Sequence, residues 1–365
     1  MKPAFFALSF FLTAPLLQAE DNEMRIRNFE NRLVALEESK VCCCTINPPA
    51  RPYAPECWGF YTTIAPILWQ AHAGGLSPVI QTKGSTEFFN TEGKSRVRNL
   101  NFDWDFGFRA GLGFNTCHDA WDLLLQWTWW CSDARLGIEI DDDDEAFYPS
   151  IGHPAQTMGQ MPRQVKSNWN ARLNLLDLEN GRDFFVSRCL SMRPFVGLRT
   201  AWIRQKFDVD YLEIPEGPNN PLSPNPQHKI DQRLRYWGIG IRGGLNTQWC
   251  LGAGFSLFSN FSTSLLYNYY KATHEEKEEG GELFKVKNFY HLGSSITDMQ
   301  IGIRFDWSTC DECFHIGLDF GWEQHYFPCQ QQFITFVDDG MVGKFINNLG
   351  DLATQGYFLA LRVDF

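Results

Sequence analysis

The sequence lacks any long hydrophobic run beyond its first residues. A membrane-spanning helix needs about 20 consecutive apolar residues, and the chain after residue 19 supplies no such run. A helical membrane protein is therefore excluded. Positive charge is scarce too, with 32 Lys and Arg against 43 Asp and Glu and a net charge of −11. Because nucleic-acid binding normally requires a basic face, nucleic acid is not expected as a partner.

Motifs for catalysis or metal binding are lacking as well. His315, Asp319, Glu323 and His325 share one face of an expected strand, but no Ser or Cys nucleophile joins them in the sequence. A single Cys-x-x-Cys pair supplies only half of the usual zinc ligands. We therefore expect no enzymatic activity, no cofactor and no metal site.

Aromatic residues, by contrast, make up 15% of the chain and recur in alternating segments. In the clearest segment, residues 100–114, every second residue is Leu, Phe, Trp or Ala, and most of the others are Asn, Asp or Gly. A strand places alternate side chains on opposite faces, so this segment has one apolar face and one polar face. Similar segments cover residues 58–71, 121–131, 168–178, 190–207, 237–245, 255–269, 299–307, 314–322 and 357–365.

The connections between these segments alternate between short and long. The long ones cover residues 73–99, 137–167, 208–234, 272–295 and 327–352. Short periplasmic turns and long external loops are typical of an outer-membrane barrel. The predicted fold class is all-β, a transmembrane antiparallel up-and-down β-barrel with a short N-terminal helix. We expect about ten strands, or twelve if a long connection hides further strands.

The amino-terminal part predicts an exported protein. Residues 1–19 have a charged start, a short apolar core and a small residue before a cleavage site, as in a signal peptide. Residues 20–41 carry an apolar a/d seam and predict a short periplasmic helix, either a coiled coil between subunits or a helix lying on its own barrel. A Cys/Pro-rich linker over residues 42–56 follows, and residues 57–365 form the barrel.

The polar face of each strand is expected to line the lumen. A charge at mid-bilayer on the lipid face costs about 2–4 kcal/mol. Opposed rows of Arg and carboxylates would tune ion selectivity in a constriction. Alternatively, they pair across a lumen that is too narrow to conduct, because small barrels are filled by side chains. The expected pore-lining residues are Asp103, Asp105, Arg109, Arg172, Arg193, Arg199, Arg242, Asp298, Arg304, Asp306, Asp319, Glu323 and Arg362.

The chain has 11 cysteines, and export would place them in an oxidising compartment. Nine precede the first strand or lie in or beside short turns, which predicts the periplasmic side. These disulfide candidates are Cys42, Cys43, Cys44, Cys57, Cys117, Cys189, Cys250, Cys310 and Cys313. An odd number leaves at least one thiol unpaired or bonded to another chain. The sequence does not decide between two arrangements: disulfides that cross-link different chains, and intramolecular disulfides that leave one free thiol.

Four stretches carry a family resemblance: Trp58–Tyr61 with Leu68–His72, Phe102–Gly113, Arg193–Ile203 and Leu359–Phe365. They resemble the Legionella-type major outer membrane proteins, pore-forming proteins also found in chlamydia-like bacteria. The resemblance covers nearly the whole mature chain, and the triple Cys departs from it. It implies an outer-membrane porin without a catalytic motif.

The resemblance also implies a role for the last strand. Its lipid-facing row would be the signal read by the barrel-assembly machinery. This row consists of Tyr357, Leu359, Leu361, Val363 and Phe365.

The expected function is that of a porin for passive diffusion of ions and small hydrophilic solutes in the bacterial outer membrane. The alternative is a filled barrel that acts as a disulfide-linked envelope structural protein or as an adhesin. The expected partners are outer-membrane lipid and lipopolysaccharide, the barrel-assembly machinery, further copies of the chain in a homo-oligomer such as a trimer, and disulfide-linked envelope proteins.

Overall fold

The computed structural model describes residues 49–50, 59–83, 94–116, 118–141, 145–154, 161–213, 228–278, 281–308, 315–337 and 343–365. The expected signal peptide and N-terminal helix lie outside these residues, as does most of the linker. Pro49 and Ala50 belong to the linker. Pro49 forms an isolated bridge with Phe184, and the Ala50 amide donates to the Asp183 carbonyl at 3.2 Å. None of the described residues forms a helix that is long and apolar enough to cross a membrane.

Antiparallel strands dominate the described residues. The main strands are β1 (Gly59–Ala73), β5 (Trp104–Asn115), β6 (Trp121–Glu139), β8 (Gln164–Arg182), β10 (Leu190–Leu212), β11 (His228–Gly252), β12 (Phe255–Glu278), β13 (Gly281–Ser308), β14 (His315–Gln331) and β17 (Gly350–Asp364). Each pairs with its neighbour in this order, and β17 pairs back with β1. The sheet holds 12 strands, two of which, β4 (Asn101–Phe102) and β9 (Phe184–Phe185), are two residues long.

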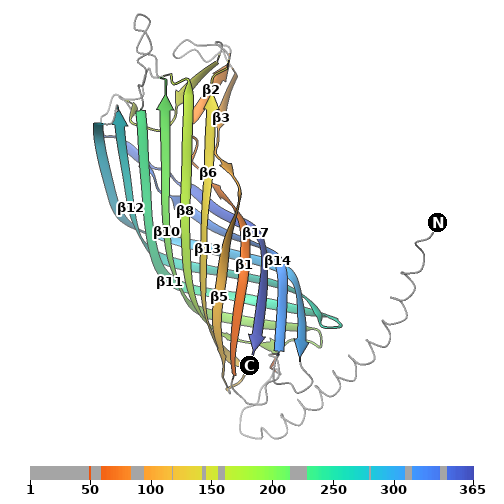
Figure 1. The fold of residues 1–365 in the computed structure, drawn as a ribbon. Coiled ribbons are helices and arrows are strands. Elements are labelled where there is room, and N and C mark those ends of the chain that lie inside the picture. Colours follow the sequence, from red (N-terminus) through yellow and green to blue (C-terminus); the bar gives the residue numbers. More distant parts are fainter. Residues whose placement is uncertain are drawn as a thin grey trace, which may run out of the picture.

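The sheet closes into a tall barrel, because β1 pairs with β5 on one side and β17 on the other, and β10 pairs with β11 (Figure 1). The predicted all-β antiparallel barrel architecture is confirmed. Hydrogen bonds between Phe60 and Phe365, at 3.0 and 3.2 Å, join the first and last strands at their lower ends. Closure leaves the main sheet without a free edge.

The strands on one side are much longer than the sequence analysis predicts. Strands β10, β11, β12 and β13 contain 23, 25, 24 and 28 residues. The expected long loop over residues 272–295 is wrong, because β12 continues to Glu278 and β13 begins at Gly281. In the upper part of β12 the outward residues are polar, so the apolar alternation that marks a lipid-facing strand is missing there.

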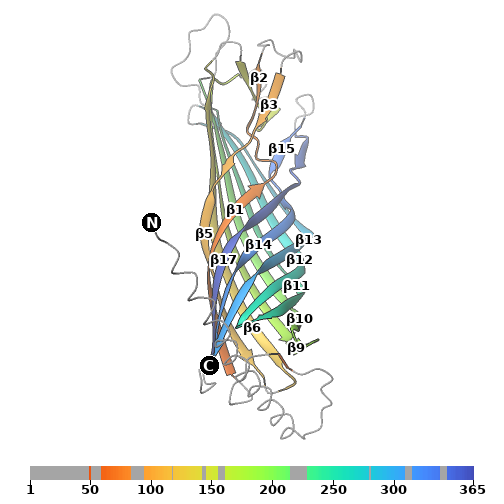
Figure 2. The same ribbon diagram turned by 90° about the vertical axis from the view of Figure 1, so that its right-hand side faces the viewer.

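The connections at the end opposite the carboxyl terminus form two small sheets (Figure 2). Strands β2 (Val79–Lys83), β3 (Lys94–Arg98) and β7 (Glu145–Pro149) pair in the order β3-β2-β7. Strands β15 (Ile334–Phe336) and β16 (Phe345–Asn347) pair within the connection between β14 and β17, here called the last loop.

An apolar band surrounds the barrel. On β11 it runs from Trp237 to Trp249, whose side chains are 43% and 59% exposed. This stretch, with 12 steps between its ends, spans about 40 Å along a strand, or about 28 Å along the membrane normal at a tilt of about 45°. This height fits the apolar band of an outer-membrane barrel, which is about 25 Å tall.

The upper lumen is filled by large side chains. Trp69, Trp130, Trp169, Tyr236 and Tyr270 are buried there and form the aromatic plug. Ring centroids of Trp69 and Trp130 lie 5.8 Å apart, and those of Tyr236 and Tyr270 lie 5.0 Å apart. The upper barrel is therefore packed like the interior of a small barrel.

The last loop folds inward onto this filled region. Phe333 and Ile334 are buried, and the Phe333 ring lies 6.1 Å from that of Phe207 on β10. The Gln232 side chain donates to the Ile334 carbonyl at 2.9 Å. The last loop thereby covers the outer end of the lumen.

Two glycines sit where neighbouring strands approach closely. A Cβ atom on Gly197 would lie 1.9 Å from the Leu178 carbonyl oxygen, and one on Gly240 would lie 1.9 Å from the Leu265 carbonyl oxygen. Gly197 is opposite Arg242 in the register, and Gly240 is opposite Arg199. These positions leave the lumenal space to the two arginines.

Candidate functional site

The lower lumen is lined by charged side chains, which the period-two pattern turns inward while their apolar neighbours face outward. On β10, for example, Arg199 is buried between the exposed Leu198 and the half-buried Thr200. The buried and largely buried charged residues of this part of the lumen are here called the lumenal charge network. They are Arg109, Asp122, Asp177, Glu179, Arg193, Arg199, Arg242, Asp298, Glu323 and His325.

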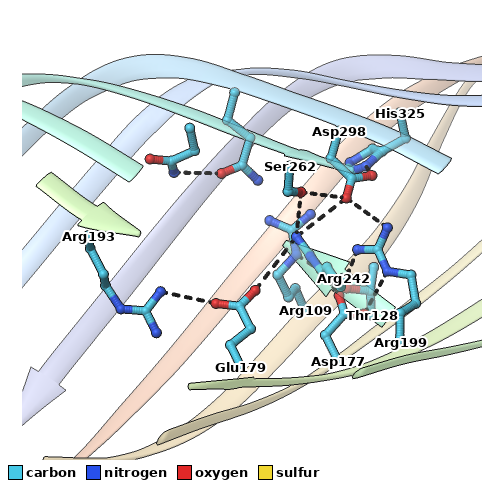
Figure 3. A network of polar contacts seen from close by, with 12 residues as sticks. Arg109, Thr128, Asp177, Glu179, Arg193, Arg199, Arg242, Ser262, Asp298 and His325 are labelled. Carbon is cyan, nitrogen blue, oxygen red and sulfur yellow. Dashed lines mark hydrogen bonds and ion pairs between the residues drawn. The ribbon is translucent and has the colours of Figure 1, made fainter. Parts of the chain in front are cut away.

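Two arginines and two aspartates form the centre of this network (Figure 3). Arg199 donates two hydrogen bonds to Asp177, at 2.6 and 2.8 Å, and one to Asp298 at 2.7 Å. Arg242 donates to Asp177 and lies 3.3 Å from Asp298. His325 Nδ1 lies 2.7 Å from Asp298 Oδ1. Residues from β8, β10, β11, β13 and β14 thus meet across the lumen.

A second set joins the network to the aromatic plug. Arg109 Nη2 donates to Glu323 Oε2 at 2.9 Å, and Arg109 Nε donates to Thr128 at 3.2 Å. The Trp69 indole donates to the other Glu323 oxygen at 2.7 Å, and Gln300 donates to Oε2 at 2.6 Å. Glu323 is fully buried and has four hydrogen-bond or ion-pair donors around it, counting His325 at 3.7 Å.

Arg193 extends the network toward the end of the barrel that carries the carboxyl terminus. It makes a bidentate contact with Asp122, at 2.5 and 2.8 Å, and donates to Glu179 at 3.1 Å. Bidentate arginine–carboxylate pairs are strong and fix geometry. Asp122 comes from β6 and Glu179 from β8, so this arginine ties three adjacent strands together.

A lower layer lies near the end of the barrel that carries the carboxyl terminus. Arg304 binds Asp319 through two hydrogen bonds, at 2.5 and 2.6 Å. Arg362 binds Asp364 at 2.6 Å and stacks over the Tyr61 ring at 3.9 Å. His315 bridges Asp364 and Asp306, at 2.9 and 3.1 Å.

A cavity of about 190 Å³ lies among these charged residues. Its walls include Arg109, Asp177, Arg199, Arg242 and Asp298. At about 30 Å³ per water molecule, this volume holds roughly six waters. No group of three or more His, Cys, Asp and Glu side chains in the described part of the chain is arranged to hold a metal ion.

Most of the expected pore-lining residues lie inside the barrel. Asp105, Arg193, Arg304, Asp306, Asp319 and Arg362 are at least half-buried, and Arg109, Arg199, Arg242, Asp298 and Glu323 are buried. Asp103 is exposed between β4 and β5. The assignment of Arg172 to the lumen is wrong, because its side chain is exposed on the outer face of β8. The inward-pointing side chains on this part of β8 are instead Trp169, Leu173 and Leu175. They belong to the apolar filling of the upper lumen.

Sequence reasoning misses Asp122, Asp177 and Glu179. For two of them the sequence does contain a signal: Asp177 and Glu179 alternate with Leu176 and Leu178 along β8, as lumenal residues alternate with lipid-facing ones. The expected strand ends at Leu178, which leaves Glu179 in a turn.

Four cysteines lie in the described part of the chain: Cys131, Cys189, Cys250 and Cys329. All four are free thiols. The Cys250 amide donates to the Cys189 carbonyl at 2.7 Å, so these two candidates face each other at the lower end of β10 and β11. The other seven cysteines lie outside the described residues.

A separate buried cluster lies well above the apolar band. Glu276 Oε2 accepts from His228 at 3.0 Å, and Oε1 contacts His274 Nε2 and the His153 amide, both at 2.6 Å. Burial would raise the pKa of Glu276, but hydrogen bonds from His228 and His274 outweigh it and lower that pKa to about 2. The cluster fastens the β7 connection, which carries His153, to the barrel wall.

A closed antiparallel ring with an apolar outer band and a charged lumen defines an outer-membrane β-barrel protein. The chain belongs to the family described as Legionella pneumophila major outer membrane protein precursor, whose model matches residues 56–365. The family resemblance and the outer-membrane location are thereby confirmed. No curated protein sequence matches the chain.

Three solved structures illustrate the structural comparison. The outer membrane protease OmpT from Escherichia coli has 9% identity and a TM-score of 0.37, covering 84% of this chain and 96% of that one. A major outer membrane protein from Thermus thermophilus has 11% identity and a TM-score of 0.28, covering 85% and 100%. A FadL homologue from Pseudomonas aeruginosa has 9% identity and a TM-score of 0.25, covering 84% and 90%.

Proposed function

We propose that the protein is a porin, a passive pore for ions and small hydrophilic solutes. The observation that carries this proposal is the polar cavity of about 190 Å³ inside the lumenal charge network. Solutes would move past the opposed Arg and carboxylate side chains, whose field would select among ions. The barrel would act without catalysis and without a cofactor.

The free-energy cost of burying charged side chains in the lumen supports a functional role for them. Ionisable residues at bilayer depth are expensive and commonly mark an ion or substrate pathway. Replacing a buried ion pair with well-packed apolar residues is often neutral or stabilising. A barrel needed only as a scaffold could therefore be filled with apolar side chains, as its upper half is. The lower half instead holds paired charges such as Arg199 and Asp177.

The aromatic plug and the last loop would form the gate of this pore. Phe333 and Ile334 are buried against the barrel interior, whereas Phe345 and Ile346 of the same loop are 42% and 53% exposed. Conduction would require the buried pair to leave the lumen. Loops with few apolar anchors open more readily than the barrel wall.

Planar-bilayer recording of the purified full chain tests the proposal. We expect discrete channel steps from the wild type. The F333A/I334A variant should spend more time open, because it loses the buried side chains of the last loop. The matched F345A/I346A variant loses two exposed side chains of the same loop and should gate like the wild type. Absence of channel steps from both the wild type and F333A/I334A would sink the porin proposal.

The aromatic plug also favours a second function, that of a filled barrel acting as an envelope scaffold or adhesin. This alternative would use chain-to-chain disulfides through periplasmic cysteines such as Cys189. Non-reducing gels of freshly isolated envelopes separate the two. Scaffold function predicts a ladder that collapses with reductant, together with silent bilayers. A monomer band under both conditions contradicts the scaffold.

A further inference from the structure

Four adjacent strands each carry one cation in register on the outer face of the barrel. Arg204 on β10 is opposite Arg172 on β8 and Arg235 on β11, and Arg235 is opposite Lys271 on β12. Arg172, Arg204 and Arg235 are exposed, and Lys271 is half-buried. These four residues are here called the basic row. With strands about 4.8 Å apart, the row is about 14 Å long.

The basic row lies at the upper border of the apolar band. Two residues below it in each strand, on the same face, are Asn174, Trp202, Trp237 and Tyr269. Trp and Tyr collect at the level of lipid headgroups. Two residues above it, Arg233 on β11 and Lys287 on β13 are also exposed and on the same face. The row therefore sits where the headgroups of the outer leaflet meet the barrel.

The described residues supply no ion-pair partner for this row. Like charges directly opposite each other on adjacent strands are destabilising. In the part of the chain that the structure describes, no acidic side chain forms an ion pair with Arg172, Arg204, Arg235 or Lys271, and Lys271 instead stacks on the Phe289 ring at 5.1 Å.

Several cations further from the membrane, unlike those of the basic row, have carboxylate partners. Lys277 contacts Asp231 and Glu275, at 3.0 and 2.8 Å, and Lys285 contacts Glu275 at 2.6 Å. Lys229 contacts Asp210 at 3.3 Å. In a chain of net charge −11, carboxylates are abundant. An anion from outside the chain would supply the partner that the described residues do not give to the basic row.

We propose that the basic row is a binding site for the phosphate groups of a phosphorylated glycolipid in the outer leaflet of the membrane. Guanidinium groups bind phosphate through bidentate hydrogen bonds. Clusters of Lys and Arg at a membrane surface attract anionic headgroups. The acyl chains of the same lipid would lie on the apolar band below, against Trp202 and Trp237. This site does not depend on whether the lumen conducts.

Titration of the purified full chain with fluorescent diphosphorylated lipid A in detergent tests this site. The variant R172Q/R204Q/R235Q should bind on the order of 100-fold more weakly. The matched variant K94Q/R96Q/R188Q loses the same charge from exposed residues outside the row and should stay within about threefold of the wild type. Heat-dependent gel mobility checks that each variant forms a barrel. If the triple variant does not fold, R204Q and R235Q singly should each weaken binding several-fold.

Two further arms identify the ligand. Dephosphorylated lipid A should bind the wild type about as weakly as diphosphorylated lipid A binds the triple variant. Inorganic phosphate should not displace the lipid, because it lacks acyl chains. Undiminished lipid binding by the folded triple variant, or equal binding of the dephosphorylated lipid, overturns the proposal. Displacement by inorganic phosphate at comparable concentration would make this a free-anion site and would also overturn it.

Discussion

Replacing Asp298 with Asn tests whether the lumenal charge network stabilises the barrel as one unit. Asp298 is buried and contacts Arg199 at 2.7 Å, Ser262 at 3.0 Å, His325 at 2.7 Å and Arg242 at 3.3 Å. Asparagine keeps the shape but removes the negative charge. Both arginines then rely on Asp177 as their main carboxylate partner.

The size of the effect follows from this geometry. Removing one partner of a buried ion pair costs about 3–5 kcal/mol, because the other charge stays buried. Since Asp177 still binds both arginines, we expect D298N to lower the free energy of unfolding by about 3 kcal/mol. The D177N variant loses the bidentate contact with Arg199, so its free energy of unfolding should decrease by about 5 kcal/mol, the upper value of this range. The double variant should depart from additivity by about 1–3 kcal/mol, because the two aspartates share the same arginines.

Reversible urea unfolding in lipid vesicles, followed by tryptophan fluorescence, measures these differences. The control is D133N, since Asp133 pairs with Arg135 at 3.1 Å with side chains 46% and 77% exposed. This control should change stability by no more than about 0.5 kcal/mol. If D298N lies within about 0.5 kcal/mol of the wild type, or if D133N is equally destabilised, the network is not a stabilising unit.

Three further predictions concern other parts of the barrel. Because the folded pKa of Glu276 is about 2 and its ordinary value is 4.5, its contribution of about 3 kcal/mol should be complete above pH 4.5 and lost as pH falls toward 2. An E276Q variant that keeps the wild-type pH dependence of stability in this range would contradict that. Deleting Phe365 should impair membrane assembly more than R362A does, and normal surface levels without Phe365 would argue against an assembly role. If the pore conducts, R199Q should shift the reversal potential toward greater cation preference, and an unchanged potential would place the ion path elsewhere.

Much of the barrel could be predicted from alternation alone. The apolar row from Trp237 to Leu245, and the inward positions of Arg199 and Asp298, follow from a period of two and from the cost of charge in lipid. Alternation does not say which face points outward once a strand leaves the membrane. The prediction for Arg172 is wrong for this reason, because the apolar residues of upper β8 fill the lumen.

The aromatic plug and the network partners required three-dimensional information. The sequence does not show that Trp69 and Trp130 meet, and only the register of the strands shows that they pack together inside the barrel. The contact between Arg199 and Asp298 joins residues 99 positions apart. No local pattern encodes a pairing across the lumen.

The glycines opposite the central arginines restrict how this protein can evolve. Any side chain at Gly197 or Gly240 would collide with a neighbouring carbonyl oxygen at 1.9 Å. New lumenal groups therefore cannot be introduced at these two positions by single substitutions without separating the strands. Natural variation in solute preference should accumulate elsewhere, at lumenal positions that already carry a side chain, such as Ser262 and Gln300 in the cavity wall. The close approach of the strands at Gly197 and Gly240 therefore keeps the space beside Arg199 and Arg242 free of other side chains.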